Sequence, residues 1–329
     1  MRVLACPDKF RGTATAVEAS AAIADAADAV GATCDRQPLA DGGEGTLEAL
    51  GGANRSTEVT GPLGDPVHAA WGLRDRVAII EMAMASGLLL AGGAEHNDPL
   101  DASTTGTGEL IAAAVEAGAR RVILGVGGSA TTDGGLGALR AMPPPARLRG
   151  VEIVVACDVR TRFVDAAEVF APQKGASRAQ VALLRRRLER LAAVYLEEHG
   201  VDVSTLERSG AAGGLAGGLA AVGAQLREGF DVVADEVELY DQMEAVDLVV
   251  TGEGRLDSTS FDGKVVGGVV ALAAEAGVPV MAVVGTVQPG FEPPLEVLDL
   301  SVEVGPTRAM DDTSAAISEV LTTRLARNG

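Results

Sequence analysis

The chain has 329 residues, of which 47% are hydrophobic and 22% charged, and it carries a formal net charge of −19 at pH 7. This length predicts two domains of about 150 residues each, and the negative charge argues against nucleic acid as a partner, because proteins that bind it carry a basic face. No apolar run is long enough to span a bilayer, and the apolar residues at 3–6 are too few for a signal peptide, so we expect a cytoplasmic protein without membrane contact. The three cysteines are far apart, which predicts small buried residues rather than a disulfide framework.

The first part of the chain twice repeats the order strand, loop and helix. Residues 2–6 read as a strand, and the capping box Thr15-Ala16-Val17-Glu18 starts a helix that stops at Gly31. Residues 32–39 predict a second strand, and a short helix begins at Thr46.

The middle of the chain mixes two kinds of pattern. Residues 57–90 carry turn signals between short strands, which predicts a small antiparallel section within a second domain. A helix over 108–117, capped by Thr107, and a strand over 121–126 follow. Residues 151–156 are apolar except for Glu152 and predict another strand.

The last part of the chain returns to alternating helices and strands. Residues 179–198 alternate apolar and charged residues at helical spacing, and the Gly/Ala-rich stretch 210–224 suits a helix packed closely against another backbone. The remaining predicted elements are strands at 247–250, 278–284 and 302–304 and a helix at 265–276. Strands buried on both faces and alternating with helices predict an open, mostly parallel α/β sheet.

Charged and glycine-rich residues follow five of the predicted strands. In open α/β sheets ligands bind outside the carboxyl ends of the strands, so we expect these five segments to meet at one rim. Glycine backbone N–H groups followed by a helix start favour an anion, which indicates phosphate. The segments are Asp8-Lys9, Asp41-Gly42-Gly43-Glu44, "GGSATTDGGLG" at 127–137, Asp158, and "TGEGRLDS" at 251–258.

Carboxylates beside phosphate-binding loops are typical of a phosphotransferase. Mg²⁺ takes one or two protein oxygens plus phosphates, an aspartate can accept a proton from the attacking hydroxyl, and cations offset the charge on the transferred group. Of the 27 basic residues only Lys9, Lys174 and Lys264 are lysines. Gly125-x-Gly127-x-x-Ala130 matches a relaxed dinucleotide fingerprint and leaves an NAD-dependent oxidoreductase open, although no acidic residue follows at the expected distance of about 20 residues.

Ten segments, taken in order, resemble bacterial glycerate kinases of the two-domain α/β type. They are "PDKFRGTATA", "PLADGGEGT", "TGPLGDPV", "AIIEMAMASGL", "DPLDASTTGTGELI", "GGSATTDGGLG", "VACDV", "FAPQKGAS", "GAAGGLAGGL" and "LVVTGEGRLDSTSFDGK". The resemblance implies ATP-dependent phosphorylation of D-glycerate with Mg²⁺ by a monomer or homodimer, giving 2-phosphoglycerate or 3-phosphoglycerate. The reaction is expected in a cleft between a Rossmann-like domain, residues 1–58 and 235–329, and an inserted α/β domain, residues 59–234, with segment 102–160 assignable to either.

The candidate site residues fall into four groups. A small carboxylate substrate needs a cation and its hydroxyls need acceptors, and Lys264 stands at a predicted helix start, where the helix dipole disfavours a cation unless an anion binds there. The catalytic candidates are Asp8, Lys9, Asp41, which we expect to be the general base, and Lys264. The nucleotide and phosphate candidates are Gly127, Gly128, Ser129, Thr131, Gly134, Gly252, Glu253 and Gly254; the substrate candidates are Lys174, Arg255 and Asp257; and the metal candidates are Asp133, which could instead order its loop, and Asp158.

The chain departs from the pattern of these kinases in two places. "RAMPPPARLRG" at 140–150 stands where they have a longer segment, and "RTRFVDAAEVF" at 160–170 is also shorter. Two alternatives therefore stay open, namely a nucleotide or sugar-acid binding protein with weakened catalysis and a kinase of another small hydroxy acid.

Overall fold

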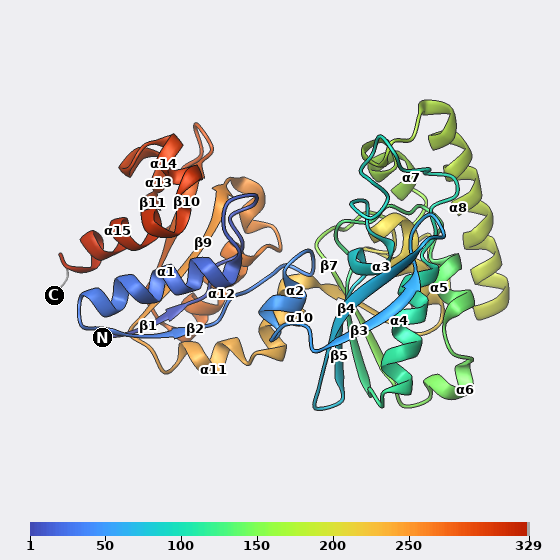
Figure 1. The fold of residues 1–329 in the computed structure, drawn as a ribbon, viewed down its shortest axis with the longest axis horizontal. Helices are drawn as coiled ribbons and strands as arrows, with labels where there is room; N and C mark the ends of the chain where they lie inside the picture. The colour runs from blue at the N-terminus through green and yellow to red at the C-terminus, as the bar shows by residue number, and fades with distance from the viewer. Residues whose placement is uncertain (328–329) are drawn as a thin grey trace. The chain divides into compact units, whose positions relative to one another are not determined.

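The computed structural model describes residues 1–327 as an α/β protein of two compact units, which confirms the predicted fold class (Figure 1). The first unit comprises residues 1–41, 48–50 and those from 230 onward, and the second comprises 42–47 and 51–229. The expected boundaries were at 58/59 and 234/235; β3 (Arg55–Thr60) belongs to the second unit because it pairs along its length with β4 (Pro66–Arg74). Segment 102–160 lies in the second unit.

The first unit is built on a fully parallel sheet in the order β11-β10-β9-β1-β2. Its alternating side chains supply two cores: Val3 and Ala5 face α1 and α15, whereas Leu4 faces α11 and α12. Both faces are thus covered by helices, which explains the apolar strand sequences. The elements are β1 Arg2–Ala5, β2 Thr33–Arg36, β9 Leu248–Leu256, β10 Val280–Val287, β11 Glu296–Asp299, α1 Ala16–Ala29, α10 Gly229–Glu236, α11 Leu239–Met243, η3 Ser258–Phe261, α12 Val265–Ala276, α13 Leu300–Glu303, α14 Pro306–Asp311 and α15 Thr313–Leu325, with the short α2 Thr46–Ala49 at a boundary with the second unit.

Local capping decides two element boundaries in this unit. The predicted capping box of α1 is present: Thr15 Oγ1 accepts from Glu18 N at 3.1 Å, and Glu18 Oε2 accepts from Thr15 N at 2.8 Å. The strand predicted at 302–304 is wrong, because the last strand is β11 and Asp299 ends it by capping α13, with Oδ1 2.9 Å from Ser301 N.

The second unit has a six-stranded sheet in the order β3-β4-β5-β6-β7-β8. The β3, β4 and β5 strands are antiparallel, as predicted for residues 57–90, and β5 to β8 are parallel. Its further elements are β5 Val77–Glu81, β6 Arg121–Gly125, β7 Glu152–Cys157, β8 Gln225–Glu228, α3 Ala83–Ser86, α4 Thr105–Glu116, α5 Leu136–Ala141, α6 Pro145–Leu148, α7 Ala166–Phe170, η1 Pro172–Lys174, α8 Arg178–His199, η2 Ala211–Gly214 and α9 Leu215–Ala221.

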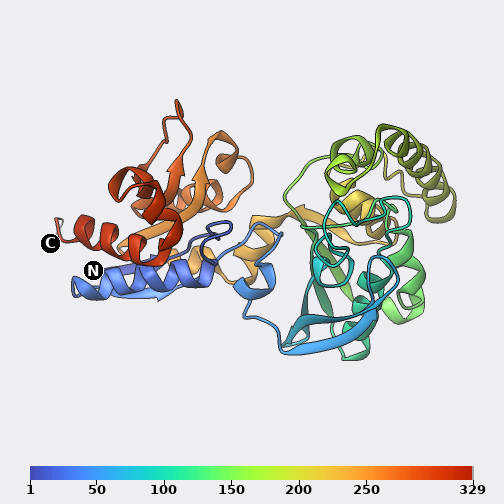
Figure 2. The same cartoon turned by 45° about the horizontal axis from the view of Figure 1, so that its top comes forward.

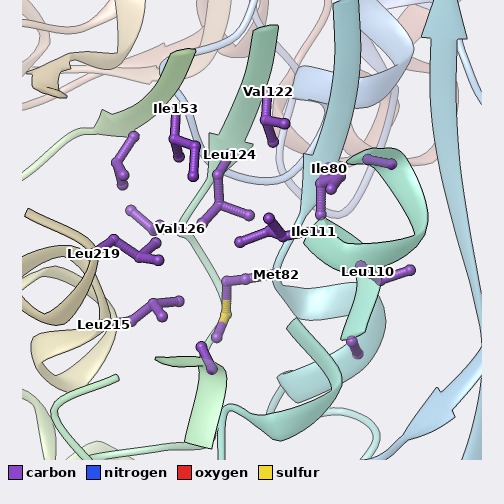
Figure 3. Packing of buried hydrophobic residues seen from close by; sticks show 14 of the residues in the cluster. Ile80, Met82, Leu110, Ile111, Val122, Leu124, Val126, Ile153, Leu215 and Leu219 are labelled. Atoms are coloured by element: carbon purple, nitrogen blue, oxygen red, sulfur yellow. The ribbon is translucent and has the colours of Figure 1, made fainter. Parts of the chain in front are cut away.

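The core of the second unit lies between this sheet and helices α4 and α9. Figure 3 shows Leu124 and Ile153 from the sheet facing Ile111 of α4 and Leu219 of α9. The prediction that Thr107 caps α4 is wrong, because the helix begins at Thr105 and Thr107 lies inside it. The buried Thr107 hydroxyl is hydrogen-bonded to the hydroxyl of Ser86 at 2.8 Å.

The Gly/Ala-rich segment packs backbone to backbone against residues 131–135, as its composition predicts. Gly134 N donates to Gly213 O at 3.1 Å. A Cβ on Gly213 would lie 2.0 Å from Thr131 O, and one on Gly218 would lie 2.5 Å from Gly134 O. Only glycine permits this approach.

None of the helices in residues 1–327 is both long and apolar enough to cross a membrane.

Candidate active site

The five segments expected at one rim belong to two different sheets, so the single rim is wrong. Asp8-Lys9, Asp41 and residues 251–258 lie in the first unit, whereas the glycine loop, residues 127–137, and Asp158 lie in the second. The predicted loop at Thr251–Gly254 is also wrong, because β9 continues through these residues to Leu256 in register with β10. Strand pairing here overrides the turn preference of glycine.

The first unit gathers three carboxylates and two lysines, Asp8, Asp41, Glu253, Lys9 and Lys264, which we name the Asp8 cluster. Asp8 is anchored to β9, since its N–H donates to the carbonyl of Gly252 at 2.8 Å. Its Oδ1 accepts from Lys9 N at 2.7 Å and lies 3.9 Å from Lys9 Nζ. Burial and the charge of Asp41 raise the pKa of Asp8 from its ordinary 3.8 to about 6, against the opposing charges of Lys9 and Lys264.

Glu253 is a second carboxylate of this cluster, and its side chain is half-buried. Burial raises its pKa to about 7, and the charge of Asp8 adds to the effect, while a hydrogen bond with Ser260 and the charge of Lys264 oppose it. Its Oε1 is buried and has no hydrogen-bond partner in the described part of the chain. The charge of Asp8 disfavours ionisation of Glu253. Burial and a neighbouring like charge are the two causes that keep some active-site carboxyl groups protonated close to neutral pH.

Lys264 immediately precedes α12, as the sequence predicts. Its Nζ donates to Thr259 Oγ1 at 3.1 Å. Asp257, a substrate candidate, caps the short helix η3 instead: its Oδ1 accepts from Thr259 N at 2.8 Å and Thr259 Oγ1 at 2.6 Å, and these bonds lower its pKa. Arg255 is exposed on β9, with its guanidinium 3.5 Å from Gln288 Oε1.

In the second unit, Asp133 holds the glycine loop in shape. Its Oδ2 accepts from Thr104 N at 2.9 Å, Thr104 Oγ1 at 2.8 Å and Gly137 N at 3.2 Å, and its Oδ1 accepts from Gly135 N at 3.1 Å. With four donors on its two oxygens, this carboxylate is committed to ordering the loop. Asp158, the other metal candidate, is exposed after β7.

Lys174 lies beneath the glycine loop and is only 2% exposed. Its Nζ donates to Ser129 Oγ at 2.7 Å and to Thr131 O at 2.6 Å. Burial lowers the pKa of Lys174 from 10.5 to about 7, with the Asp133 charge opposing. A neutral amine has two N–H donors, which matches the two acceptors. The structure therefore places Lys174 as a support of residues 129–131 rather than at a surface open to substrate.

The glycine candidates of this loop differ in their surroundings. Gly128 is exposed with φ +69°, so its N–H lies in a segment open to a ligand. Gly127 packs against Gly43, whose Cα a Cβ on Gly127 would approach to 2.8 Å, and Gly134 is buried against Leu191 and Phe163.

Sequence reasoning missed Glu81, which ends β5 and is 8% exposed. Its Oε1 accepts from Gly45 N at 3.0 Å and from Leu47 N at 2.8 Å, so it shapes the glycine-rich segment after Asp41. A carboxylate at the end of an all-apolar strand was the available signal. Within residues 1–327, no three His, Cys, Asp or Glu side chains gather closely enough to hold a metal ion by themselves.

The sequence model of the glycerate kinase family matches residues 3–144 and 142–302. The chain belongs to this family. The family assignment made from the ten segments is thus confirmed, and the two matched pieces meet inside the "RAMPPPARLRG" segment.

Named relatives and a solved structure agree with this family assignment. The chain is 38% identical to the glycerate 2-kinase of Escherichia coli K12, with 87% of this chain and 85% of that protein covered, and 36% identical to the glycerate kinase of Halalkalibacterium halodurans, with 99% and 96% covered. The crystal structure of a putative glycerate kinase 2 from Salmonella typhimurium LT2 is similar with a TM-score of 0.84 and 34% identity, covering 100% of this chain and 99% of that one. This family member is therefore an enzyme of the phosphotransferase class that acts on an alcohol group.

Proposed function

We propose that the enzyme transfers the terminal phosphoryl group of ATP to the 2-hydroxyl of D-glycerate, with Mg²⁺, and releases 2-phosphoglycerate. The names of its relatives support glycerate as acceptor, and the Escherichia coli glycerate 2-kinase supports the 2-hydroxyl. The observation that carries the proposal is a pair of carboxylates beside lysines in the first unit, the buried Asp8 and the half-buried Glu253. Phosphoryl transfer to an alcohol needs both a proton acceptor and cations.

In this proposal Asp8 is the general base, in place of Asp41, which the sequence favoured. A base works best with a pKa near the operating pH, and the value of about 6 for Asp8 meets that condition. Asp41 acts through its charge, which raises the pKa of Asp8.

Lys264 and Lys9 supply the positive charge of the proposed site. Both ammonium groups lie close enough to Asp8 to lower its pKa through their charges. They therefore stand near the carboxylate that accepts the proton in this proposal. Lys264 also precedes α12, whose N-terminal dipole adds to its attraction for phosphate oxygens. We assign to Lys264 the contact with the transferring phosphoryl group.

The donor set of the Asp8 cluster fits Mg²⁺. The ion is usually held by one or two carboxylates together with substrate phosphates, and Glu253 Oε1 is a buried carboxylate oxygen without a partner among the described residues. When bound, Mg²⁺ would neutralise phosphate charge. Asp133 does not fit this role because its oxygens already accept four hydrogen bonds.

The glycine loop of the second unit is the proposed binding element for nucleotide phosphates. The exposed Gly128 and the hydroxyl of Ser129 stand on a backbone that Lys174 and Asp133 hold from within. Such a preformed loop offers N–H groups to an anion without an ordering cost at the moment of binding.

The test is ADP release with D-glycerate, ATP and Mg²⁺, followed by phosphorus NMR of the product. Asp8→Asn should lower kcat by about 10²- to 10⁴-fold, as loss of a general base does, and Asp25→Asn, an exposed change on α1, should leave it unchanged. ADP binding without turnover would favour a binding protein, and absorbance change with a nicotinamide cofactor instead of ADP release would favour an oxidoreductase. Either result would refute the proposal.

A further inference from the structure

A hollow of about 760 Å³ lies within the second unit, between α8, α5 and residues 100–105. Helices α5 and α8 lie close to each other within this unit (Figure 1 and Figure 2). Leu136, Leu188 and Leu191 line the hollow with apolar surface. Its volume lies within the range of roughly 300–1,000 Å³ typical of small-molecule sites.

Four arginines line the same hollow. Arg140 comes from α5, and Arg186, Arg187 and Arg190 come from α8, where spacings of three and four residues put them on one face. This concentration stands out because the whole chain carries a net charge of −19.

Two carboxylates, Asp101 and Asp133, also line the hollow. Asp133 is committed to its four loop donors, so Asp101 is the remaining acidic group there. Two negative charges from the aspartates against four positive charges from the arginines leave an excess of positive charge around the hollow.

The guanidinium groups of Arg140, Arg186 and Arg190 have no ion pair among residues 1–327, and that of Arg187 donates to the carbonyl of Leu100 at 2.8 Å. Arg185, on the same helix but outside the hollow, behaves differently, since it pairs with Glu168 at 2.9 Å and with Glu189 at 3.2 Å. The four arginines are exposed, and like charges at neighbouring positions of a helix repel by about 0.2–0.5 kcal/mol per pair, so an anion bound between them would relieve this repulsion.

We propose that this hollow binds a phosphorylated organic anion. Guanidinium groups match phosphate oxygens through paired N–H donors, and the leucines offer surface to the carbon skeleton of the ligand. The inference needs neither glycerate as the acceptor nor a particular general base.

The position of the hollow links it to the glycine loop. Thr132, Asp133 and Gly137 belong both to its lining and to that loop, and Thr132 Oγ1 is buried without a hydrogen-bond partner in the described residues. A bound anion therefore contacts the loop whose Ser129 end we assign to nucleotide phosphates. The ligand is either the substrate nucleotide itself or a second phosphorylated metabolite that modulates the loop.

Calorimetric titration with ATP, 2-phosphoglycerate and inorganic phosphate tests the proposal on the full-length protein. The double variant R186Q/R190Q should weaken the Kd of at least one of these probes about tenfold or more, because charge-assisted hydrogen bonds are lost. Arg178→Gln, on the exposed first turn of the same helix and outside the hollow, is the matched control and should leave every Kd unchanged.

The same variants distinguish the two sources of the ligand. If ATP affinity and kcat/KM for ATP fall together, the hollow holds the substrate nucleotide; if a probe loses affinity while kcat/KM stays unchanged, it is a separate site. Equal affinity of wild type and R186Q/R190Q for all three probes, or an equal loss in Arg178→Gln, would overturn the proposal. These readouts are binding constants, so their failure differs from a failure of glycerate phosphorylation, which appears as missing ADP release.

Discussion

Replacing Asp8 with asparagine should inactivate the enzyme and at the same time make the free protein more stable above pH 6. In the folded chain the pKa of Asp8 is raised from 3.8 to about 6, mainly by burial. The folded state therefore holds the proton more tightly than the unfolded state, and folding stability falls as pH rises through the interval from about 4 to about 6. Asparagine keeps the shape and the acceptor for Lys9 N but has no charge to desolvate.

The expected gain follows from the size of the shift. About two pKa units at 1.36 kcal/mol each give up to about 3 kcal/mol of added unfolding free energy above pH 6, and only about 0.5 kcal/mol at pH 4, where Asp8 is neutral in the folded state and about half ionised in the unfolded chain. Removing the Asp8 charge also removes one cause that raises the pKa of Glu253, so that carboxyl should ionise at a lower pH in the variant.

Urea denaturation at pH 4 and pH 8 measures both values, with circular dichroism following the whole chain. Fluorescence of Trp71, the single tryptophan, follows the second unit, because that residue is buried in β4. The added stability of Asp8→Asn at pH 8 should appear in the unfolding curve followed by circular dichroism. The unfolding of the second unit, followed by Trp71 fluorescence, should not change, because Asp8 lies in the first unit. A loss of stability at pH 8, or full kcat in the variant, would contradict the assignment of Asp8 as a buried base.

Three further changes test other parts of the structure. Lys264→Met should lower kcat about 100-fold with an unchanged circular dichroism spectrum, since one preorganised charge contact is lost; unchanged kcat would remove Lys264 from the site. Gly213→Ala should cost more than about 2 kcal/mol in urea denaturation because its Cβ meets Thr131 O, whereas Gly223→Ala, in open space at φ +100°, should cost only the backbone strain of about 1–2 kcal/mol; equal losses would contradict the close packing. The folded state disfavours the charged form of Lys174, so the folded protein becomes more stable as the amine loses its proton. The unfolding free energy of the wild type should therefore rise by about 2 kcal/mol between pH 7 and pH 8.5, and that of Lys174→Met should not. Equal changes with pH in the two proteins would contradict the burial of Lys174.

Local signals in the sequence predicted most of the fold. The capping box at Thr15 and the apolar runs of β1, β6 and β7 act over a few residues, and the structure has these elements within one or two residues of the prediction. The strand at Thr251–Gly254 was not predicted, because these residues become a strand by pairing with β10. Local turn propensity carries no information about that distant partner.

The sequence predicted only part of the candidate site, because local signals do not contain contacts between distant residues. The sequence selected Asp8, Lys9, Asp41 and Lys264, and their electrostatic interactions show that the structure brings them together in one unit. It did not predict that Lys174 is buried, because the acceptors of its amine group, Ser129 Oγ and Thr131 O, stand more than 40 residues earlier in the chain. Long-range hydrogen bonds decide burial of a charged side chain, and composition does not record them.

The interrupted course of the first unit sets the order in which the chain can fold during synthesis. Strand β1 pairs with β9, so Val3 cannot pair with Leu248 until residues 248–256 have left the ribosome. Nearly all of the second unit, by contrast, lies in the continuous segment 51–229. The second unit can therefore fold while the first still lacks its central strand. Closing so long a loop costs little more than closing a shorter one, since each doubling of loop length adds only about 0.6 kcal/mol. Strand β1 can pair early with β2 on one side, and it gains its other neighbour, β9, only near the end of synthesis.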